Sequence, residues 1–317
     1  MTNTKGKKVG VVGLTPKQSR IVEGVYQNAQ EPQKITYSHS TLCQTSLPFK
    51  DMGEVREWKN RNGDALVLLE AGQAYNPEIA DTVRLGLPYG AKPRLILMYL
   101  NSQAIKTQSP EIAVEDSLYA FIKRLGIQPD GREYKRIKDQ LSRLAAAHIT
   151  IGRTEADGSG TTQWGRIVDK MNVFFSKDEH QRVLWPNTVR LSRDYFESLS
   201  RHAVPLDENA LHLLRDSALE LDLYAMFSER LHRIPENRPQ FIPWAFLHEQ
   251  YGSGYARIGD FRRRFMGHLQ NVRGVYPYAQ IEETTDSRGQ SKGLTLFNSP
   301  PPVLKISVVV SKSVEIE

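Results

Sequence analysis

The sequence predicts an α+β, predominantly helical protein with two tandem winged-helix domains, each carrying a β-hairpin wing. The order helix, helix, basic helix, strand pair occurs twice along the 317 residues. In both copies the basic helix has an apolar stripe on one side and cations on the other, which suits a helix that packs on a core and faces a polyanion. A chain of this length also exceeds one small helical unit, so two domains are expected.

The N-terminal segment 1–60 is polar and weakly periodic, and it is expected to be a loosely ordered arm. Residues 61–204 form the first predicted domain. Its apolar runs predict a buried strand over Asp64–Glu70 and a buried helix over Lys92–Ser102. A short strand at 111–114, a helix over Glu115–Leu125 stopped by Gly126, and a basic helix over Arg132–His148 should follow.

Two alternating stretches, 148–154 and 166–175, flank a turn-rich segment and predict the wing of the first domain. Segment 188–192 is expected to extend the same sheet. The stretch 166–175 has the pattern of an exposed edge strand, which can pair with a strand of another chain. It is therefore the expected contact of a homodimer.

Residues 205–300 form the second predicted domain, followed by a C-terminal tail at 301–317. One long helix should run over Asn209–Ile234 and end before Pro235, and a short helix should cover Pro243–Gln250. An arginine-rich helix at 257–273 comes next. Segments 275–283 and 292–297 then predict a terminal hairpin.

The arginine-rich helix has five arginines and a single acid, Asp260. At helical spacing its apolar residues fall on one stripe, and Gly267 lies on the opposite face, where it permits close approach to another surface. Arginine can bind guanine through two hydrogen bonds, and glutamine or asparagine can bind adenine in the same way. A solvated basic face is the alternative, but a second basic helix favours DNA binding. The stripe is Ile258, Phe261, Phe265, Leu269 and Val272, and the predicted DNA contacts are Arg257, Arg262, Arg263, Arg264, Gln270, Asn271 and Arg273.

The basic helix of the first domain mixes cations with Asp139 and Ser142, which suits phosphate contacts better than base reading. The tip of the terminal hairpin is basic and is expected to reach phosphates or the minor groove. The tip of the first wing carries Glu155 and Asp157, which phosphate would repel, so an ordinary turn is favoured there over a DNA contact. The predicted contacts are Arg132, Lys135, Arg136 and Arg143 on the helix, and Arg288 and Lys292 on the terminal hairpin.

Charge and motifs favour a DNA-binding protein over an enzyme. The net charge is +6, yet residues 205–252 carry eight acidic against four basic residues, so the positive charge that follows is local. The chain has no GxxxxGK[ST] or GxSxG motif, no HExxH and no pair of histidines separated by one residue. Cys43 is the single cysteine, and no run of eighteen apolar residues exists. We therefore expect a cytoplasmic protein without a catalytic site, metal or cofactor.

Segment 86–127 resembles the core of RepA-type plasmid replication initiators. The shared pattern is G-x-P-x-G-x-x-P-R followed by I-x-x-x-x-S-L, and the resemblance extends over roughly residues 60 to 300. It implies a theta-type initiator with two winged-helix domains that binds direct repeats (iterons) at a plasmid origin and promotes opening of the origin. It also implies recruitment of the host initiator ATPase and the replicative helicase, and autorepression as a dimer. The residues that carry it are Gly86, Pro88, Gly90, Pro93, Arg94, Ile112, Ser117 and Leu118.

Two other functions remain open at this point. A winged-helix transcriptional regulator would bind DNA without a role in replication. A nicking enzyme would need the histidine pair that the sequence lacks. Direct repeats beside the gene would favour the initiator, and a lone palindrome would favour the regulator.

Overall fold

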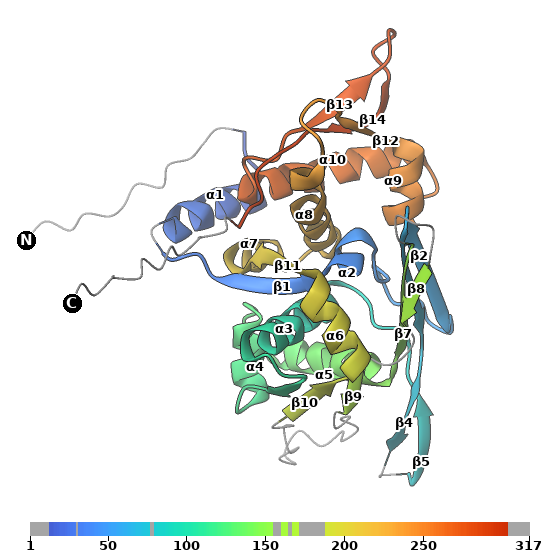
Figure 1. Cartoon of the computed structure of the whole chain (residues 1–317). Coiled ribbons are helices and arrows are strands. Elements are labelled where there is room, and N and C mark those ends of the chain that lie inside the picture. Colours follow the sequence, from blue (N-terminus) through green and yellow to red (C-terminus); the bar gives the residue numbers. More distant parts are fainter. Residues whose placement is uncertain are drawn as a thin grey trace, which may run out of the picture.

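One succession of elements occurs twice in the computed structural model (Figure 1). A helix leads to a short strand, two helices follow, and two more strands complete a three-stranded antiparallel sheet whose central strand is the last in sequence. The structure describes residues 13–29, 31–76, 79–154, 160–163, 167–170 and 188–303. We call the two copies the N-terminal and C-terminal units. The N-terminal unit is α3 (Ala91–Thr107), β6 (Glu111–Ala113), α4 (Leu118–Arg124), α5 (Gly131–Ala146), β9 (Val168–Lys170) and β10 (Thr188–Leu191). Its succession is interrupted between α5 and β9 by two strands, β7 (His148–Thr154) and β8 (Gly160–Gln163), that belong to another sheet. The C-terminal unit is α8 (Ala218–Arg230), β12 (Gln240–Pro243), α9 (Trp244–Tyr251), α10 (Ile258–Val275), β13 (Ile281–Thr285) and β14 (Ser291–Leu296).

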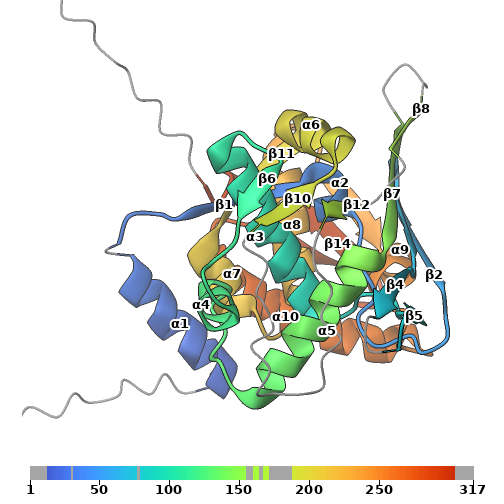
Figure 2. The ribbon, with the colours of Figure 1, turned by 90° about the horizontal axis from the view of Figure 1, so that it is seen from below.

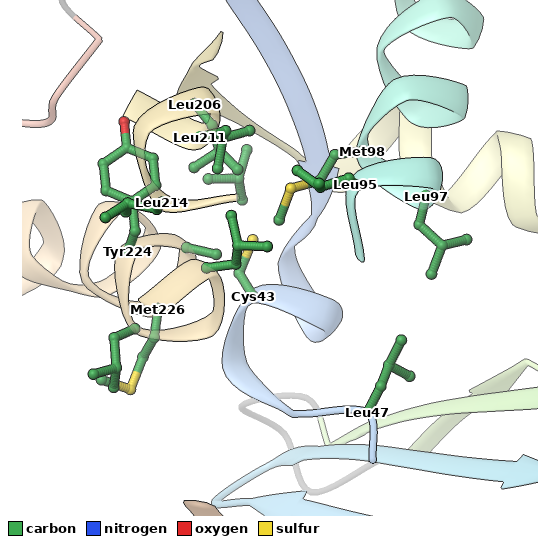
Figure 3. Packing of buried hydrophobic residues seen from close by; sticks show 14 of the residues in the cluster. Cys43, Leu47, Leu95, Leu97, Met98, Leu206, Leu211, Leu214, Tyr224 and Met226 are labelled. Atoms are coloured by element: carbon green, nitrogen blue, oxygen red, sulfur yellow. The ribbon is translucent and has the colours of Figure 1, made fainter. Parts of the chain in front are cut away.

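The first helices of the two units, α3 and α8, are the most deeply buried elements. Both have buried residues on nearly every side, most of them apolar, and both lie inside the molecule instead of on its surface. Figure 3 shows Leu95 and Met98 of α3 close to Cys43, with Tyr224 and Met226 of α8 nearby. The buried apolar side chains of both units belong to one continuous core.

Part of the N-terminal segment is folded, so its assignment as a loose arm is wrong from residue 16 onwards. It forms α1 (Pro16–Asn28), β1 (Ile35–His39) and α2 (Ser40–Gln44). Strand β1 pairs with β11 (Ala203–Asp207), α1 packs on α10, and α2 packs on α8. Polar side chains that seemed to mark an exposed arm are buried and hydrogen-bonded. For example, His39 is 2% exposed and lies 3.0 Å from Ser198 Oγ.

The predicted first wing is also wrong in its pairing. Strand β7 (His148–Thr154) pairs with β8 (Gly160–Gln163), which lies inside the predicted tip, and β3 (Ala65–Glu70) flanks β7 on its other side. Strand β9 pairs with β10 in a separate sheet, so β10 does not extend the β7 sheet. The stretch 166–175 is also the expected dimer contact. Residue 166 and residues 171–175 of this stretch lie outside the described residues. A strand β2 (Glu57–Asn62) and a small hairpin of β4 (Gln73–Asn76) and β5 (Asp81–Arg84) complete this region.

Several helix boundaries differ from the prediction. The long helix expected over Asn209–Ile234 is divided into α7 (Glu208–Leu214), α8 and a 3₁₀ turn η1 (Leu231–Arg233). Ser217 causes the break, because its side chain accepts the backbone N–H of Glu220 and starts a new helix. Helix α5 ends at Ala146, so His148 is an exposed strand residue and not a core helix residue. A further helix, α6 (Arg193–His202), precedes β11.

Among the helices that the structure describes, none is long and apolar enough to cross a bilayer.

Candidate nucleic-acid interface

The inner side of α10 is held by an aromatic cluster. Phe261 and Phe265 are fully buried, and the ring of Trp244 on α9 lies edge-on to Phe265 with ring centroids 5.5 Å apart. Leu269 and Val272 continue the buried stripe, as predicted. The exception is Ile258 at the first turn, which is 44% exposed. The packed stripe fixes which residues of α10 face outwards.

The outer side of α10 presents cations and an amide to solvent. Arg263, Arg264 and Gln270 are exposed, and a Cβ placed on Gly267 would meet no atom within 4 Å. The Arg263 side chain is 77% exposed and pairs with Asp260 one turn earlier, whose side chain is 50% exposed. Such an exposed pair is weak, so the guanidinium can exchange this partner for another anion. Arg257 is exposed before the first turn, and Arg262 and Arg273 are half-buried beside the open face.

Asn271 does not belong to this surface, contrary to the prediction. Its side chain is 9% exposed and its Nδ2 donates to Glu220 Oε1 on α8 at 2.7 Å. His268 lies 2.9 Å from the same oxygen, and Lys17 of α1 pairs with the other carboxylate oxygen at 2.5 Å. Burial alone would raise the pKa of Glu220, but the hydrogen bonds from His268, Lys17 and Asn271 outweigh it and lower that pKa. Asn271 therefore fixes α10 to α8 and cannot read a base.

The β13–β14 hairpin extends from the body next to α10 (Figure 1). At its tip Asp286 accepts the backbone N–H groups of Arg288 and Gln290, each at 2.9 Å, and pairs with Lys292 at 2.9 Å. The hydrogen bond from Lys292 is the main cause of a lowered pKa at Asp286. Arg288 and Lys292 are both exposed, so the tip offers two cations on a hairpin with a defined turn.

Helix α5 keeps three of its four predicted contacts on the surface. Arg132, Lys135 and Arg136 are exposed, and Arg136 also pairs with Glu133 one turn earlier. Arg143 is different, since its side chain is only 15% exposed and pairs with Asp51 at 3.2 Å and Asp139 at 2.9 Å. The prediction that Arg143 contacts DNA is therefore wrong.

Arg143 instead fixes the loop that precedes α3. It donates to Leu87 O at 3.1 Å and lies over the ring of Tyr89, 5.1 Å from its centroid. A side chain with this many partners within the protein has a packing role.

The two basic helices, α5 and α10, are separated in the view of Figure 1 but lie in the same half of the molecule in the view of Figure 2. Figure 1 shows α10 near the top and α5 in the lower half, with α8 and α3 between them. Figure 2 places both toward the lower edge of the view, whereas the β7–β8 hairpin projects at the opposite edge. Both helices therefore lie in the same half of the molecule in this view.

Comparison with known families agrees with the resemblance seen in the sequence. Residues 87–246 match the family model described as plasmid encoded RepA protein. The chain belongs to this family of plasmid replication proteins. The match covers α3, β6, α4 and α5 and ends in α9, before α10 begins. The interface on α10 is therefore argued from its own geometry.

Solved structures of two domains of RctB are similar in arrangement. A crystal structure of selenomethionine derivatives of RctB domains 2 and 3 has 11% identity and a TM-score of 0.48, with 81% of this chain and 95% of that chain covered. A second crystal structure of RctB domains 2–3 has 12% identity and a TM-score of 0.47, with 82% and 97% covered. The search of curated proteins found no match.

The residues that carry the family pattern have structural roles. Gly90 precedes α3 with φ of +77°, a conformation that side chains with a Cβ rarely adopt. Ser117 starts α4 by accepting the backbone N–H of Ala120 at 3.1 Å. Arg94 is buried and binds Asp222 on α8. Sequence reasoning used Arg94 only as part of a motif and missed this contact, because the partner lies 128 residues away.

Proposed function

We propose that the chain initiates plasmid replication by binding direct repeats at the plasmid origin through two winged-helix units. The observation that carries this proposal is the outer face of α10, which offers Arg263, Arg264 and Gln270 around the open Gly267. Arginine and glutamine are the side chains that recognise guanine and adenine edges in the major groove. The order of elements around α10 and the position of the β13–β14 hairpin support the winged-helix part of the proposal, in which the third helix reads DNA.

The N-terminal unit has the same order of elements, with α5 at the position of α10. In this proposal α5 contacts the phosphates of a second DNA segment and the α10 surface supplies most of the sequence specificity. The proposed contacts are Arg257, Arg262, Arg263, Arg264, Gln270 and Arg273 on α10, Arg288 and Lys292 on the hairpin, and Arg132, Lys135 and Arg136 on α5.

The remaining steps are part of the same proposal, and family membership supports them. The bound protein promotes opening of the origin and recruits the host initiator ATPase and replicative helicase. It acts in the cytoplasm without catalysis of its own, and a homodimer represses its own gene. Because direct repeats lack the two-fold axis of a dimer, we expect monomers on the repeats and dimers on a palindrome.

Footprinting on the DNA that flanks the gene tests the proposal. Purified protein should protect a series of head-to-tail sites, and a plasmid with those sites should be maintained only when the protein is supplied. Protection of a single palindrome, with no effect on plasmid maintenance, would instead favour a transcriptional regulator. A series of sites bound with equal strength in unrelated DNA would contradict sequence-specific binding.

A further inference from the structure

An ion pair at the centre of the molecule joins the first helices of the two units. Arg94 of α3 donates from Nε to Asp222 Oδ1 at 2.6 Å and from Nη2 to Asp222 Oδ2 at 2.7 Å. The two side chains are 3% and 6% exposed. Burial dominates the environment of Asp222 and raises the pKa of its carboxyl group, although Arg94 acts in the opposite direction.

The remaining donors of Arg94 are also used. Nη1 donates to Gly90 O at 2.6 Å and to Pro48 O at 3.3 Å, and Nη2 donates to Leu47 O at 2.7 Å. With the two bonds to Asp222, all five N–H groups of the guanidinium have an acceptor. The planar guanidinium therefore holds one orientation, and a two-bond contact transmits that orientation to α8.

Each basic helix is fixed to the helix that carries one partner of this pair. In the N-terminal unit, Glu133 of α5 pairs at 2.8 Å with Lys92 of α3, and Lys92 lies two residues before Arg94. In the C-terminal unit, Glu220 of α8 accepts a hydrogen bond from Asn271 of α10 at 2.7 Å, and Glu220 lies two residues before Asp222. A continuous series of short contacts thus runs from α5 through α3 and α8 to α10.

We propose that the Arg94–Asp222 pair fixes the position of α5 relative to α10 and thereby sets the spacing between the two DNA segments that one chain recognises. This inference rests on the proposed function, since it needs both helices to contact DNA. Neither residue touches DNA in this scheme, so both are positioning residues. A rigid link gives the second contact a high effective concentration at one spacing only, whereas a loose link tolerates many spacings.

The test measures binding as a function of spacing. The probe is a duplex enriched by the wild-type protein from a pool with a random core of about two helical turns, on the order of 21 base pairs. The two segments of this duplex that the protein protects in footprinting are identified first. Derivatives then carry inserts of about two, five or ten base pairs between these segments. An insert of about five base pairs rotates one segment to the opposite side of the DNA helix. Each protected segment is also tested alone.

Two variants of the pair are compared with a matched control. Asp222→Asn keeps the shape but places an amide donor against the Arg94 donors. The double variant Arg94→Met with Asp222→Leu removes both charges, a change that folded proteins often tolerate. The control is Arg56→Met, because Arg56 also binds three carbonyl groups, those of Leu85, Ala71 and Gly72, but lies outside the α5–α10 series.

For the wild type and the control, an insert of about five base pairs should weaken binding about a hundredfold. For the variants of the pair, the same insert should change the affinity by no more than about twofold, while affinity for the α10 segment alone stays at the wild-type value. Variants with a wild-type melting profile that retain the full spacing penalty would overturn the inference and leave the proposed function intact. A wild-type protein that enriches no sequence would contradict the proposed function itself.

Discussion

Arg263 and Asn271 both lie on α10, and their neighbours decide which of them can meet a ligand. Arg263 faces solvent, whereas α8 covers Asn271 and supplies Glu220 as its partner. Helical periodicity gives the angle of a residue about the helix axis, but it does not say how wide a sector the neighbouring helices cover. For this reason the sequence placed the buried stripe correctly at Phe261, Phe265 and Leu269 and placed Asn271 on the wrong side of its border.

Replacing Arg263 with alanine tests base reading directly. If Arg263 makes a two-bond contact with a base, Arg263→Ala should weaken binding to the selected duplex by about 1–3 kcal/mol and weaken binding to random DNA much less. Dissociation constants on both duplexes measure this. Arg193→Ala is the control, since Arg193 is an exposed arginine on α6 with an acidic neighbour in the same helix. An equal loss on both duplexes would assign Arg263 to phosphate.

Replacing Asn271 with alanine should affect stability and not specificity. Asn271→Ala removes a donor from the buried Glu220 carboxylate, which costs about 1–3 kcal/mol of unfolding free energy. Urea unfolding measures the loss. The ratio of affinities for the α10 segment alone and for random DNA should stay at the wild-type value, and a lower ratio would return Asn271 to the DNA contacts.

At the scale of elements, local patterns predicted the helices better than the strand pairing. The buried helix α3, the short helix α9 and the arginine helix α10 all lie where apolar spacing and proline placed them. The wing of the N-terminal unit was assigned to the wrong strands, because β8 is a polar stretch (GTTQ) and β9 pairs with a strand that follows a long connection. Strand pairing depends on partners far apart in the sequence, and one sequence carries little information about them.

The position of α1 against α10 also escaped prediction. Lys17 and Arg20 of α1 pair with Glu220 and Asp216, and Ile21 is buried next to Gly274 of α10. The segment has a capping box at Thr15 and Gln18, which is a start signal for a helix, but its low apolar content hid the fact that it packs on the core. Ile21 is the buried residue of this helix, Val25 also packs against the core, and the two ion pairs add to these contacts.

Glu220 should make the docking of α1 and α10 sensitive to acid. Its pKa lies below the ordinary value of 4.5 in the folded protein, so its stabilising contribution is present above that value and is lost as the pH falls through the lowered pKa. Glu220→Gln removes this titration. The difference in unfolding free energy between the wild type and Glu220→Gln should therefore be largest near neutral pH and shrink below pH 4.5, as urea midpoints can measure. A difference that stays constant down to the acid limit of folding would contradict the assignment.

At the scale of the whole molecule, the proposal predicts binding that needs no bound small molecule. The sequence has no GxxxxGK[ST] motif. No cluster of three or more potential metal ligands was found among the residues that the structure describes. We expect the affinity for the selected duplex to be the same with EDTA, with Mg²⁺ and with ATP present. Binding by purified protein that requires ATP would contradict this prediction.

Engagement of both units should be visible in the salt dependence of binding. Exposed cations on α5, α10 and the β13–β14 hairpin are compatible with on the order of 6–10 phosphate contacts, and each contact steepens the fall of log K with log salt by about 0.9. The double variant Arg132→Ala with Arg136→Ala removes two exposed cations of α5 and should reduce the slope by about 1.8, with the same loss of affinity on selected and random DNA.

The same measurement on Arg263→Ala separates the roles of the two units. Loss of a base contact lowers affinity for the selected duplex and changes the salt slope little, because no counterion is released from a base edge. A slope unchanged in the Arg132→Ala and Arg136→Ala double variant would mean that α5 does not touch DNA. In that case the C-terminal unit alone holds the duplex, and a fixed position of α5 relative to α10 could not set the spacing of the site.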